Sequence, residues 1–429
     1  MKAEIIAVGS ELLTPDRLDT NSLFLTEQLN RLGIEVVRKL VVGDQSSQIR
    51  DAFHEALGRV ELVVSIGGLG PTEDDLTRET VAELLGRKLV RNDAILRGIQ
   101  ARFRRLGRQM PEVNARQAMV PEGATVLENA RGTAPGLWLE TDGHILILLP
   151  GPPRELQRMF TEQVEPRLAT RSSGVRLVKR ELRVTGMTES DVEQRVAPIY
   201  TRYTETHTTL LASPGEIQLH LRTWSADAAA AEKLLDEMVE RIVLALGENI
   251  FTTAGETLEE VVARDLNRNH TTIAVAESCT GGLLAERLTS IPGSSSYFLG
   301  GVVCYSNDLK SAWVDVPGEL IQAKGAVSTE VALALAEGIR RRSGSTFGLG
   351  VTGVAGPGGG SAEKPVGTVH IALAEASGAK GRSLRFPGDR ERIRWQASQA
   401  ALDMVRRYFL YAQQSEGQKA KGRRQKMQD

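Results

Sequence analysis

A serine at a strand-to-helix turn is the feature of this chain that points most directly to chemistry. Ser278 follows the apolar run 273–275, which has the composition of a buried strand, and precedes leucines at helical spacing. The pair Gly281–Gly282 weakens the start of that helix and leaves room for a ligand. Because backbone N–H groups at a helix N-terminus can bind an anion, we predict Thr280, Gly281 and Gly282 as substrate-binding residues.

Other interpretations of this turn remain open. A serine before a helix is commonly an N-cap, and on position alone that interpretation is favoured for Ser278. Cys279 is a rival nucleophile because a thiolate is intrinsically stronger, although a small core residue is an ordinary alternative. Neighbouring side chains at a strand end face opposite ways, so only one of the two should face a cleft.

A downstream lysine could supply the base that such a serine needs. Lys310 follows Tyr305 at the end of another apolar run. A partly buried lysine can lose its charge and act as a base, whereas an isolated lysine is usually a surface residue. Tyr305 could orient that base or relay a proton, or be an ordinary half-buried aromatic. His270 lies at the start of the strand, far from Ser278, so a Ser-His-Asp triad has weak support.

A glycine-rich loop follows the strand predicted over residues 347–351. Its residues Gly353, Ala355 and Gly356 are candidate substrate-binding residues, because a loop at the carboxyl end of a parallel strand can close over a ligand. The alternative is a flexible surface loop.

Another glycine-rich loop follows the strand predicted over residues 61–66. It contains Gly67, Gly68, Gly70 and Thr72 and ends in the carboxylates of residues 73–75. It is neither a Walker loop nor a Rossmann fingerprint. Its amides could cradle phosphate, and Asp75 could hold a divalent cation bridging to it. Equally, Asp74 and Asp75 could only cap the next helix.

Further polar residues follow other strands of the same predicted sheet. Glu11 comes after the first strand, over residues 5–8, and Asp44 after the second, over residues 34–42. The segment 150–155, rich in proline, follows the last strand. Since ligands usually bind where the carboxyl ends of parallel strands converge, we expect these residues to line one site.

The elements that would position these residues alternate between strand and helix. In the first part, one helix is expected to run through Leu29 from a cap at Thr20 or Asn21, and others to start at Ser46 or Ser47 and to lie near 76–85 and over 93–106. Strands over 137–139 and 145–149 are expected to form a hairpin. This alternation predicts a mostly parallel sheet covered by helices. Between about 170 and 255, short strands over 182–184 and 217–221 and helices over 191–200 and 228–246 predict a small α+β domain, with 247–255 as a connector. The remainder is again α/β and ends in a helix over 393–411.

Composition bounds the remaining possibilities. The chain has 429 residues, which predicts two to four domains, and its formal net charge of -1 argues against a nucleic-acid-wrapping surface. Its two cysteines form no disulfide framework, no apolar run is long enough for a membrane span, and the first residues enter a strand directly. We therefore expect a cytoplasmic protein. The polar tail from residue 413 is expected to be disordered.

The carboxy-terminal segment resembles the CinA carboxy-terminal family. The motifs that carry this resemblance span residues 276–282, 305–307, 310, 325–328, 353–357, 364–368 and 386–390. The family is known as nicotinamide mononucleotide amidohydrolase, which forms nicotinate mononucleotide and ammonia. The resemblance implies Ser278 as nucleophile, Lys310 as general base and Tyr305 as supporting residue, with no cofactor.

The amino-terminal segment resembles the molybdopterin-binding fold and, more closely, the CinA amino-terminal family, through residues 9–13, 19–22, 42–44, 67–75 and 149–153. The resemblance implies a metal-dependent ADP-ribose pyrophosphatase that yields AMP and ribose 5-phosphate. Its divalent ion (Mg, Co or Mn) would be held by Asp44, Asp75 and Glu11, and Asn21 falls in a matching motif. The rival hypothesis is a non-catalytic pterin- or nucleotide-binding module with a regulatory or competence-related role. The loop 68–70 differs from the threonine-containing loop common in molybdopterin binders.

The middle segment resembles the KH-like domain of full-length CinA proteins but lacks the Gly-x-x-Gly loop that clamps RNA. We predict four parts: a three-layer molybdopterin-binding-like domain (1–169), a KH-like α+β domain (170–254), an α/β amidohydrolase domain (255–412) and the tail (413–429). The expected protein is a homodimeric, bifunctional enzyme of pyridine-nucleotide salvage that binds neither membrane nor nucleic acid.

Overall fold

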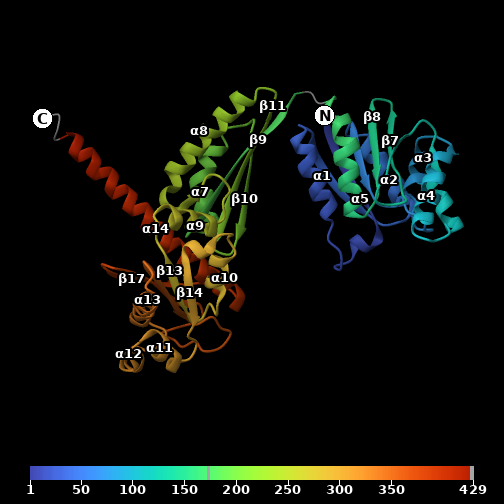
Figure 1. Ribbon diagram of the computed structural model, residues 1–429. Helices are drawn as coiled ribbons and strands as arrows, with labels where there is room; N and C mark the ends of the chain where they lie inside the picture. Colours follow the sequence, from blue (N-terminus) through green and yellow to red (C-terminus); the bar gives the residue numbers. More distant parts are fainter. Residues whose placement is uncertain (172–173, 426–429) are drawn as a thin grey trace. The chain divides into compact units, whose positions relative to one another are not determined.

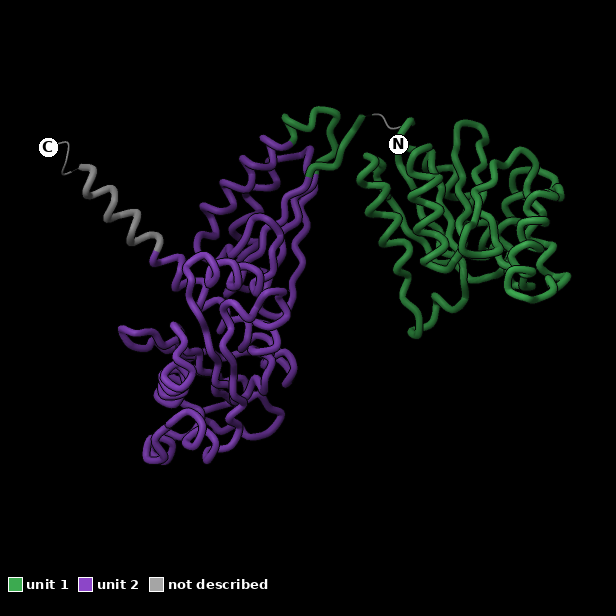
Figure 2. Tube along the Cα trace, viewed as in Figure 1, with its two compact units in different colours: residues 1–178, 223–231 green, residues 179–222, 232–429 purple. Residues whose placement is uncertain are grey.

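The computed structural model describes residues 1–171 and 174–425, with side chains described to residue 412 (Figure 1). The chain divides into two compact units, residues 1–178 with 223–231 and residues 179–222 with 232–429 (Figure 2). Within the described residues, none of the helices combines the length and hydrophobicity that crossing a bilayer requires.

The amino-terminal unit is built on a six-stranded sheet in the order β2-β1-β3-β8-β7-β6. The first four of these strands are parallel: β2 (Glu35–Val42), β1 (Lys2–Val8), β3 (Leu62–Ile66) and β8 (His144–Leu149). The antiparallel strands β7 (Gly136–Thr141) and β6 (Thr125–Leu127) complete the sheet. The predicted parallel sheet and the predicted hairpin of β7 and β8 are both confirmed.

Helices cover both faces of this sheet, as the apolar runs of its central strands require. Leu25 of α1 (Thr20–Arg31) and Leu156 of α5 (Pro153–Met159) pack in the core on one face. Phe53 of α2 (Ser46–Leu57) and Val81 of α3 (Thr77–Leu84) pack on the other. The unit is therefore the expected three-layer α/β domain.

The start of α1 differs from the prediction. Asp19 is its N-cap, since the Asp19 carboxylate accepts a hydrogen bond from the Ser22 N–H at 2.9 Å. Thr20 and Asn21 are already helical, and a helical backbone at Asn21 frees its side chain for another contact. Helix α4 (Asp93–Arg105) and a small two-stranded sheet of β4 (Leu89–Arg91) and β5 (Met119–Pro121) complete the unit.

The middle domain has a four-stranded sheet in the order β10-β11-β9-β12 and two helices, α7 (Glu189–Tyr200) and α8 (Ala228–Leu246). The strands are β9 (Arg176–Thr185), β10 (His207–Ser213), β11 (Glu216–Ser225) and β12 (Ile250–Thr252). The prediction missed β10 and was wrong for the connector over 247–255, because β12 lies within it and pairs with β9. A strand of three residues is too short to show a recognisable alternation of apolar and polar residues in the sequence.

The carboxy-terminal domain has a five-stranded sheet in the order β14-β13-β15-β16-β17. β14 (Phe298–Val303), β13 (Ile273–Glu277) and β15 (Phe347–Gly353) are parallel, and β16 (Thr368–Glu375) and β17 (Gly378–Arg385) are antiparallel. α9 (Leu258–Arg268), α10 (Leu283–Thr289) and α14 (Arg390–Gln425) pack on one face, and α11 (Asn307–Val314), α12 (Gly318–Lys324) and α13 (Thr329–Ser343) on the other.

The final helix is longer than predicted. Residues 413–425, expected to be disordered, continue α14, and residues 426–429 lie outside the described part of the chain. Lys, Arg and Gln make up most of residues 413–425 and are good helix formers, which fits a helix that continues from the packed part of α14.

Candidate active sites

Ser278 lies directly after the central strand β13, at the carboxyl edge of the parallel part of the sheet. Its N–H donates to the Val351 carbonyl of β15 at 3.0 Å, which fixes the turn 278–282 against the neighbouring strand. We call this turn the nucleophile turn, after the role predicted for Ser278. Cys279 packs in the hydrophobic core, and burial raises the pKa of its thiol to about 12. A thiol held neutral and inside the core is a poor nucleophile, so the geometry favours Ser278.

Lys310 lies on α11, where its side chain is only 1% exposed. Its Nζ is 3.2 Å from Ser278 Oγ and donates to the carbonyls of Cys304 at 3.0 Å and Tyr305 at 2.9 Å. Burial lowers the pKa of the amine. A neutral amine has two N–H donors, which the two carbonyls satisfy, so its lone pair is left for the serine hydroxyl.

The side chain of Tyr305 has a different partner from the one predicted. It is exposed, and its hydroxyl accepts from Arg390 Nη2 at 3.1 Å, while its backbone carbonyl makes the contact with Lys310. Arg390 also donates to the Gly356 carbonyl at 2.9 Å. The guanidinium therefore ties the tyrosine to the glycine-rich loop after β15.

Sequence reasoning gave no role to Arg390 or to Arg394, one helical turn further along α14. Arg394 donates through Nη2 to the Thr280 carbonyl at 2.7 Å, within the nucleophile turn. The signal was present in the sequence, because residues four apart at the start of a helix share one face.

The predicted glycine-rich residues occupy distinct places around this site. Gly353 ends β15, and a Cβ there would lie 2.7 Å from the Thr368 carbonyl, so the backbone packs closely on β16. Ala355 is buried in the core. Gly356, at a φ of 78°, is the member of the loop that connects to Tyr305 through Arg390.

The amides of the nucleophile turn are less available than expected. Gly281 N–H donates to the Ser278 carbonyl at 3.2 Å, and Gly282 N–H donates to Glu277 Oε2 at 2.9 Å. The backbone N–H of Thr280, unlike those of Gly281 and Gly282, has no acceptor identified within residues 1–171 and 174–425. The buried Thr280 hydroxyl has no hydrogen-bond partner among the same residues either. Of the amides predicted to bind the substrate in this turn, that of Thr280 therefore remains available.

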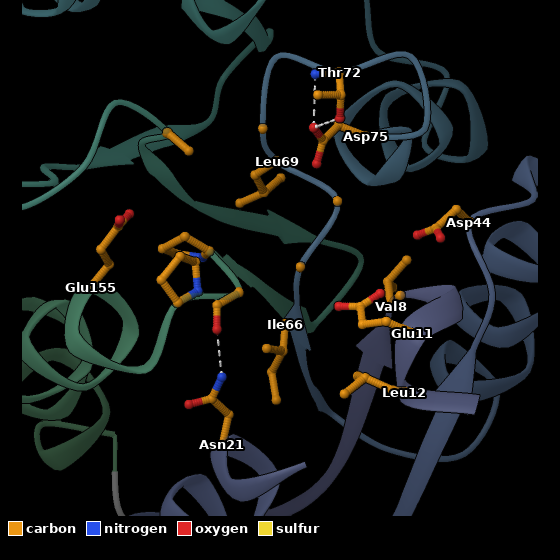
Figure 3. Close-up of a pocket in the computed structure, with 18 of the residues that line it drawn as sticks. Val8, Glu11, Leu12, Asn21, Asp44, Ile66, Leu69, Thr72, Asp75 and Glu155 are labelled. Atoms are coloured by element: carbon orange, nitrogen blue, oxygen red, sulfur yellow. Dashed lines mark hydrogen bonds between the residues drawn. The ribbon is translucent and has the colours of Figure 1, made fainter. Parts of the chain in front are cut away.

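The amino-terminal unit has a cavity of about 720 Å³ at the carboxyl edge of its parallel strands (Figure 3). The structure brings together all the residues predicted for this site, which line the cavity: Glu11, Asn21, Asp44, Gly67, Gly68, Gly70, Thr72 and Asp75. Glu155, from the segment 150–155 that was expected to reach this site, also lines the cavity. Sequence reasoning did not single out two other polar lining residues, Gln117 and Thr133, which come from segments that no local motif marks.

Glycine is required in this loop for steric reasons. Gly67 has a φ of 95°, and a Cβ there would lie 2.3 Å from the Val8 carbonyl at the end of β1. A Cβ on Gly70 would lie 2.3 Å from Asp75 Oδ2. The loop backbone therefore lies directly against the strand end and against its own carboxylate.

The three predicted metal ligands line one cavity without forming a ready-made metal site. Asp44 accepts from the Ser10 N–H at 2.8 Å, and Asp75 accepts from the Thr72 N–H at 2.9 Å and the Thr72 hydroxyl. Figure 3 shows Asp75 joined to Thr72, whereas Asp44 comes from another of the segments that line the cavity. Within the described residues, no three His, Cys, Asp or Glu side chains are grouped closely enough to hold an ion.

Asn21 approaches the same cavity from α1. Its Nδ2 donates to the Gly151 carbonyl at 2.7 Å, drawn in Figure 3, and this bond fixes the orientation of the amide. Its Oδ1 is buried, with no hydrogen-bond partner identified in the described part of the chain.

The chain thus contains two α/β domains, each with a candidate site at the carboxyl ends of its parallel strands, and a small α+β domain between them in the sequence. Three family models match the chain: a probable molybdopterin binding domain over residues 4–170, the damage-inducible protein CinA KH domain over 179–252 and the CinA C-terminal domain over 255–409. CinA-like proteins of Koribacter versatilis and Acidobacterium capsulatum are 50% and 51% identical to it, each over 96% of this chain and 100% of the relative. The chain therefore belongs to the CinA family.

Solved structures match parts of the chain. The crystal structure of the protein CinA from Thermoplasma acidophilum is 35% identical, covers 39% of this chain and 97% of its own, and has a TM-score of 0.37.

Proposed function

We propose that the carboxy-terminal domain deamidates nicotinamide mononucleotide to nicotinate mononucleotide and ammonia. The observation that carries the proposal is the 3.2 Å approach of a buried lysine amine to a serine hydroxyl, in a domain of the CinA C-terminal family. A serine activated by a neutral lysine is suited to acyl transfer from an amide.

The proposed reaction proceeds in two halves. Neutral Lys310 takes the proton of Ser278 as Oγ attacks the carboxamide carbon, and the tetrahedral oxyanion is stabilised near the Thr280 N–H. The C–N bond breaks, the proton passes from Lys310 to the leaving nitrogen, and ammonia departs. Water, deprotonated by Lys310, then attacks the acyl carbon, and Ser278 leaves with that proton.

Ammonia release from nicotinamide mononucleotide tests this proposal. Ser278→Ala and Lys310→Ala should each lower kcat by about 100-fold or more, as expected for loss of a nucleophile or a general base. Cys279→Ala should remain active. Loss of activity only in Cys279→Ala would transfer the nucleophile role to the thiol, and a wild-type protein that releases no ammonia would refute the assignment.

For the amino-terminal domain we propose hydrolysis of ADP-ribose to AMP and ribose 5-phosphate, assisted by a divalent ion. The supporting observation is the cavity in which a glycine-rich loop meets three carboxylates. Magnesium is usually held by one or two carboxylates together with substrate phosphates, so Asp44 or Asp75 with Glu11 fits such an ion once a diphosphate is present. The ion would neutralise charge on the diphosphate and activate water.

A non-catalytic pterin- or nucleotide-binding role is the alternative for this domain. The two differ in product: AMP and ribose 5-phosphate should appear from ADP-ribose with Mg²⁺, Co²⁺ or Mn²⁺ and disappear with a chelator. Binding of the nucleotide without product would favour the binding module, and hydrolysis unaffected by chelation would contradict the role of the metal.

A further inference from the structure

The carboxylate of Glu277, immediately before the nucleophile, is buried at the start of α10. Its side chain is 1% exposed and accepts from three backbone N–H groups: Gly282 at 2.9 Å, Leu284 at 3.1 Å and Ala285 at 2.8 Å. These amides are unpaired donors at a helix N-terminus, and a carboxylate satisfies them together with the positive end of the helix dipole. The chain itself thus supplies the anion at this helix start.

The backbone of Glu277 also contacts the segment that orients Lys310, the proposed general base. The Cys304 N–H donates to the Glu277 carbonyl at 2.9 Å, and the Cys304 carbonyl accepts from Lys310 Nζ at 3.0 Å. The side chain of Glu277 therefore holds the start of α10, the helix that follows the nucleophile turn. The carbonyl of Glu277 holds Cys304, whose own carbonyl orients Lys310.

The central position of β13 gives this arrangement its rigidity. Glu277 pairs with Val303 of β14 on one side and with Val351 of β15 on the other. Because the strand cannot shift without breaking both ladders, the carboxylate is a fixed point against which α10 begins. Gly281 and Gly282, at φ values of 61° and 95°, allow the chain to fold back onto it.

We propose that Glu277 is a positioning residue of the deamidase site, acting through the turn 278–282 rather than on the substrate. This inference rests on the proposed deamidase function. It makes a specific claim about the turn: without the carboxylate, the amides of α10 lose their acceptor and Ser278 loses its fixed approach to Lys310. A displacement of about 1 Å in a reacting group can lower a rate by about 100-fold.

Glu277→Gln tests the proposal, with Glu260→Gln as the matched control. Glu260 also accepts an amide at a helix start of this domain, from Thr257 N–H at 2.7 Å, but in the capping box of α9. We expect Glu277→Gln to lower kcat for nicotinamide mononucleotide by about 10- to 100-fold with KM changed less than about threefold, because positioning acts on the reacting groups. Glu260→Gln should keep the wild-type kcat.

A second readout does not depend on the substrate. Amide hydrogen exchange at residues 282–285 should become about tenfold faster or more in Glu277→Gln alone, as local opening is favoured there. Labelling of Ser278 by a fluorophosphonate should slow in the same variant. Wild-type kcat in Glu277→Gln, or a lower kcat with unchanged exchange and labelling, would overturn the proposal.

The remaining outcomes are also decisive. If Glu277→Gln does not fold, Glu277→Asp, which keeps the charge on a shorter side chain, should show a smaller change in the same direction, and wild-type behaviour would refute the proposal. If the wild-type protein releases no ammonia, the deamidase assignment fails. Exchange and labelling then decide by themselves whether Glu277 fixes the serine turn.

Discussion

At the residue scale, the proposed deamidation depends on the charge of Lys310. Three oxygen atoms surround its Nζ, and burial lowers the pKa of the amine, so a lone pair becomes available below the pH at which an exposed lysine would be neutral. The buried base and the serine at the strand end are each unremarkable alone. Their distance is what gives them a joint role.

The first prediction concerns pH. Because the reaction needs the neutral amine, kcat/KM for ammonia release should rise with pH and level off, with a midpoint below the ordinary lysine value of 10.5. Steady-state kinetics across the alkaline range, with buffer and salt held constant, measures it. A rate that falls as the pH rises through this range would contradict a lysine base.

The lowered pKa of Lys310 also affects the stability of the folded protein. At pH values between the lowered pKa of Lys310 in the folded protein and its pKa in the unfolded chain, the unfolded chain binds more protons than the folded one. In this pH range, Lys310 therefore makes the free energy of unfolding increase with pH. Lys310→Met should lose that increase. Denaturant unfolding of both proteins across the window measures the difference, and identical slopes would show that burial does not shift the amine.

The third prediction concerns Arg390, which bridges Tyr305 and Gly356. Arg390→Ala should raise KM for nicotinamide mononucleotide by about tenfold, because the glycine-rich loop loses a charge-assisted contact worth roughly 1.5–3 kcal/mol. Arg392→Ala, on the same helix, is the control and should leave KM unchanged. Equal effects of the two substitutions would argue against a specific role for the bridge.

At the element scale, each site is built where parallel strands end and the chain turns into a helix. In the amino-terminal unit the turn after β3 must pass close to the end of β1, and only glycine permits this approach at Gly67. In the carboxy-terminal domain the turn after β13 is held instead by the carboxylate of Glu277. The two sites thus use different means to fix a similar loop.

The fourth prediction tests the glycine turn. Gly67→Ala should lower the free energy of unfolding by about 1–3 kcal/mol through backbone strain, with a further cost from the clash with the Val8 carbonyl, and should abolish nucleotide binding. Gly86→Ala is the control, since Gly86 also has a positive φ of 62° but no atom within 4 Å of an added Cβ. Calorimetric unfolding and ADP-ribose titration measure both effects. Retained binding in Gly67→Ala would contradict a tightly fitted loop.

At the scale of the whole molecule, the two sites belong to two compact units. The cavity lined by Asp75 lies in the first unit, and Ser278 and Lys310 lie in the second. Because each site is complete within its own unit, the two proposed activities should be separable.

The fifth prediction is a crosswise inactivation in the full-length chain. Ser278→Ala should remove ammonia release and keep ADP-ribose hydrolysis, whereas Asp75→Asn should do the reverse. A chelator should inhibit only ADP-ribose hydrolysis. Loss of both activities in either variant, with the fold preserved by circular dichroism, would contradict two independent sites.

The α/β alternation, most strand positions and the candidate residues at the strand ends can be predicted from the amino-acid sequence alone. This is possible because apolar periodicity and glycine-rich turns are local signals. Glu11, Asp44 and the loop 67–75 were predicted for this reason, since they follow the strands β1, β2 and β3, whereas Asn21 lies in α1.

Which side chains come into contact depends on the way the elements pack, which the sequence does not show. Sheet order and helix packing set three contacts. Lys310 approaches Ser278, and Tyr305 pairs with Arg390. The Glu277 carboxylate accepts from the amides at the start of α10. The short strand β12 also exists only through its pairing with β9. Burial made the rest of the difference, because Lys310, which the sequence presents as a surface cation, is removed from water by the fold, and this lowers the pKa of its amine.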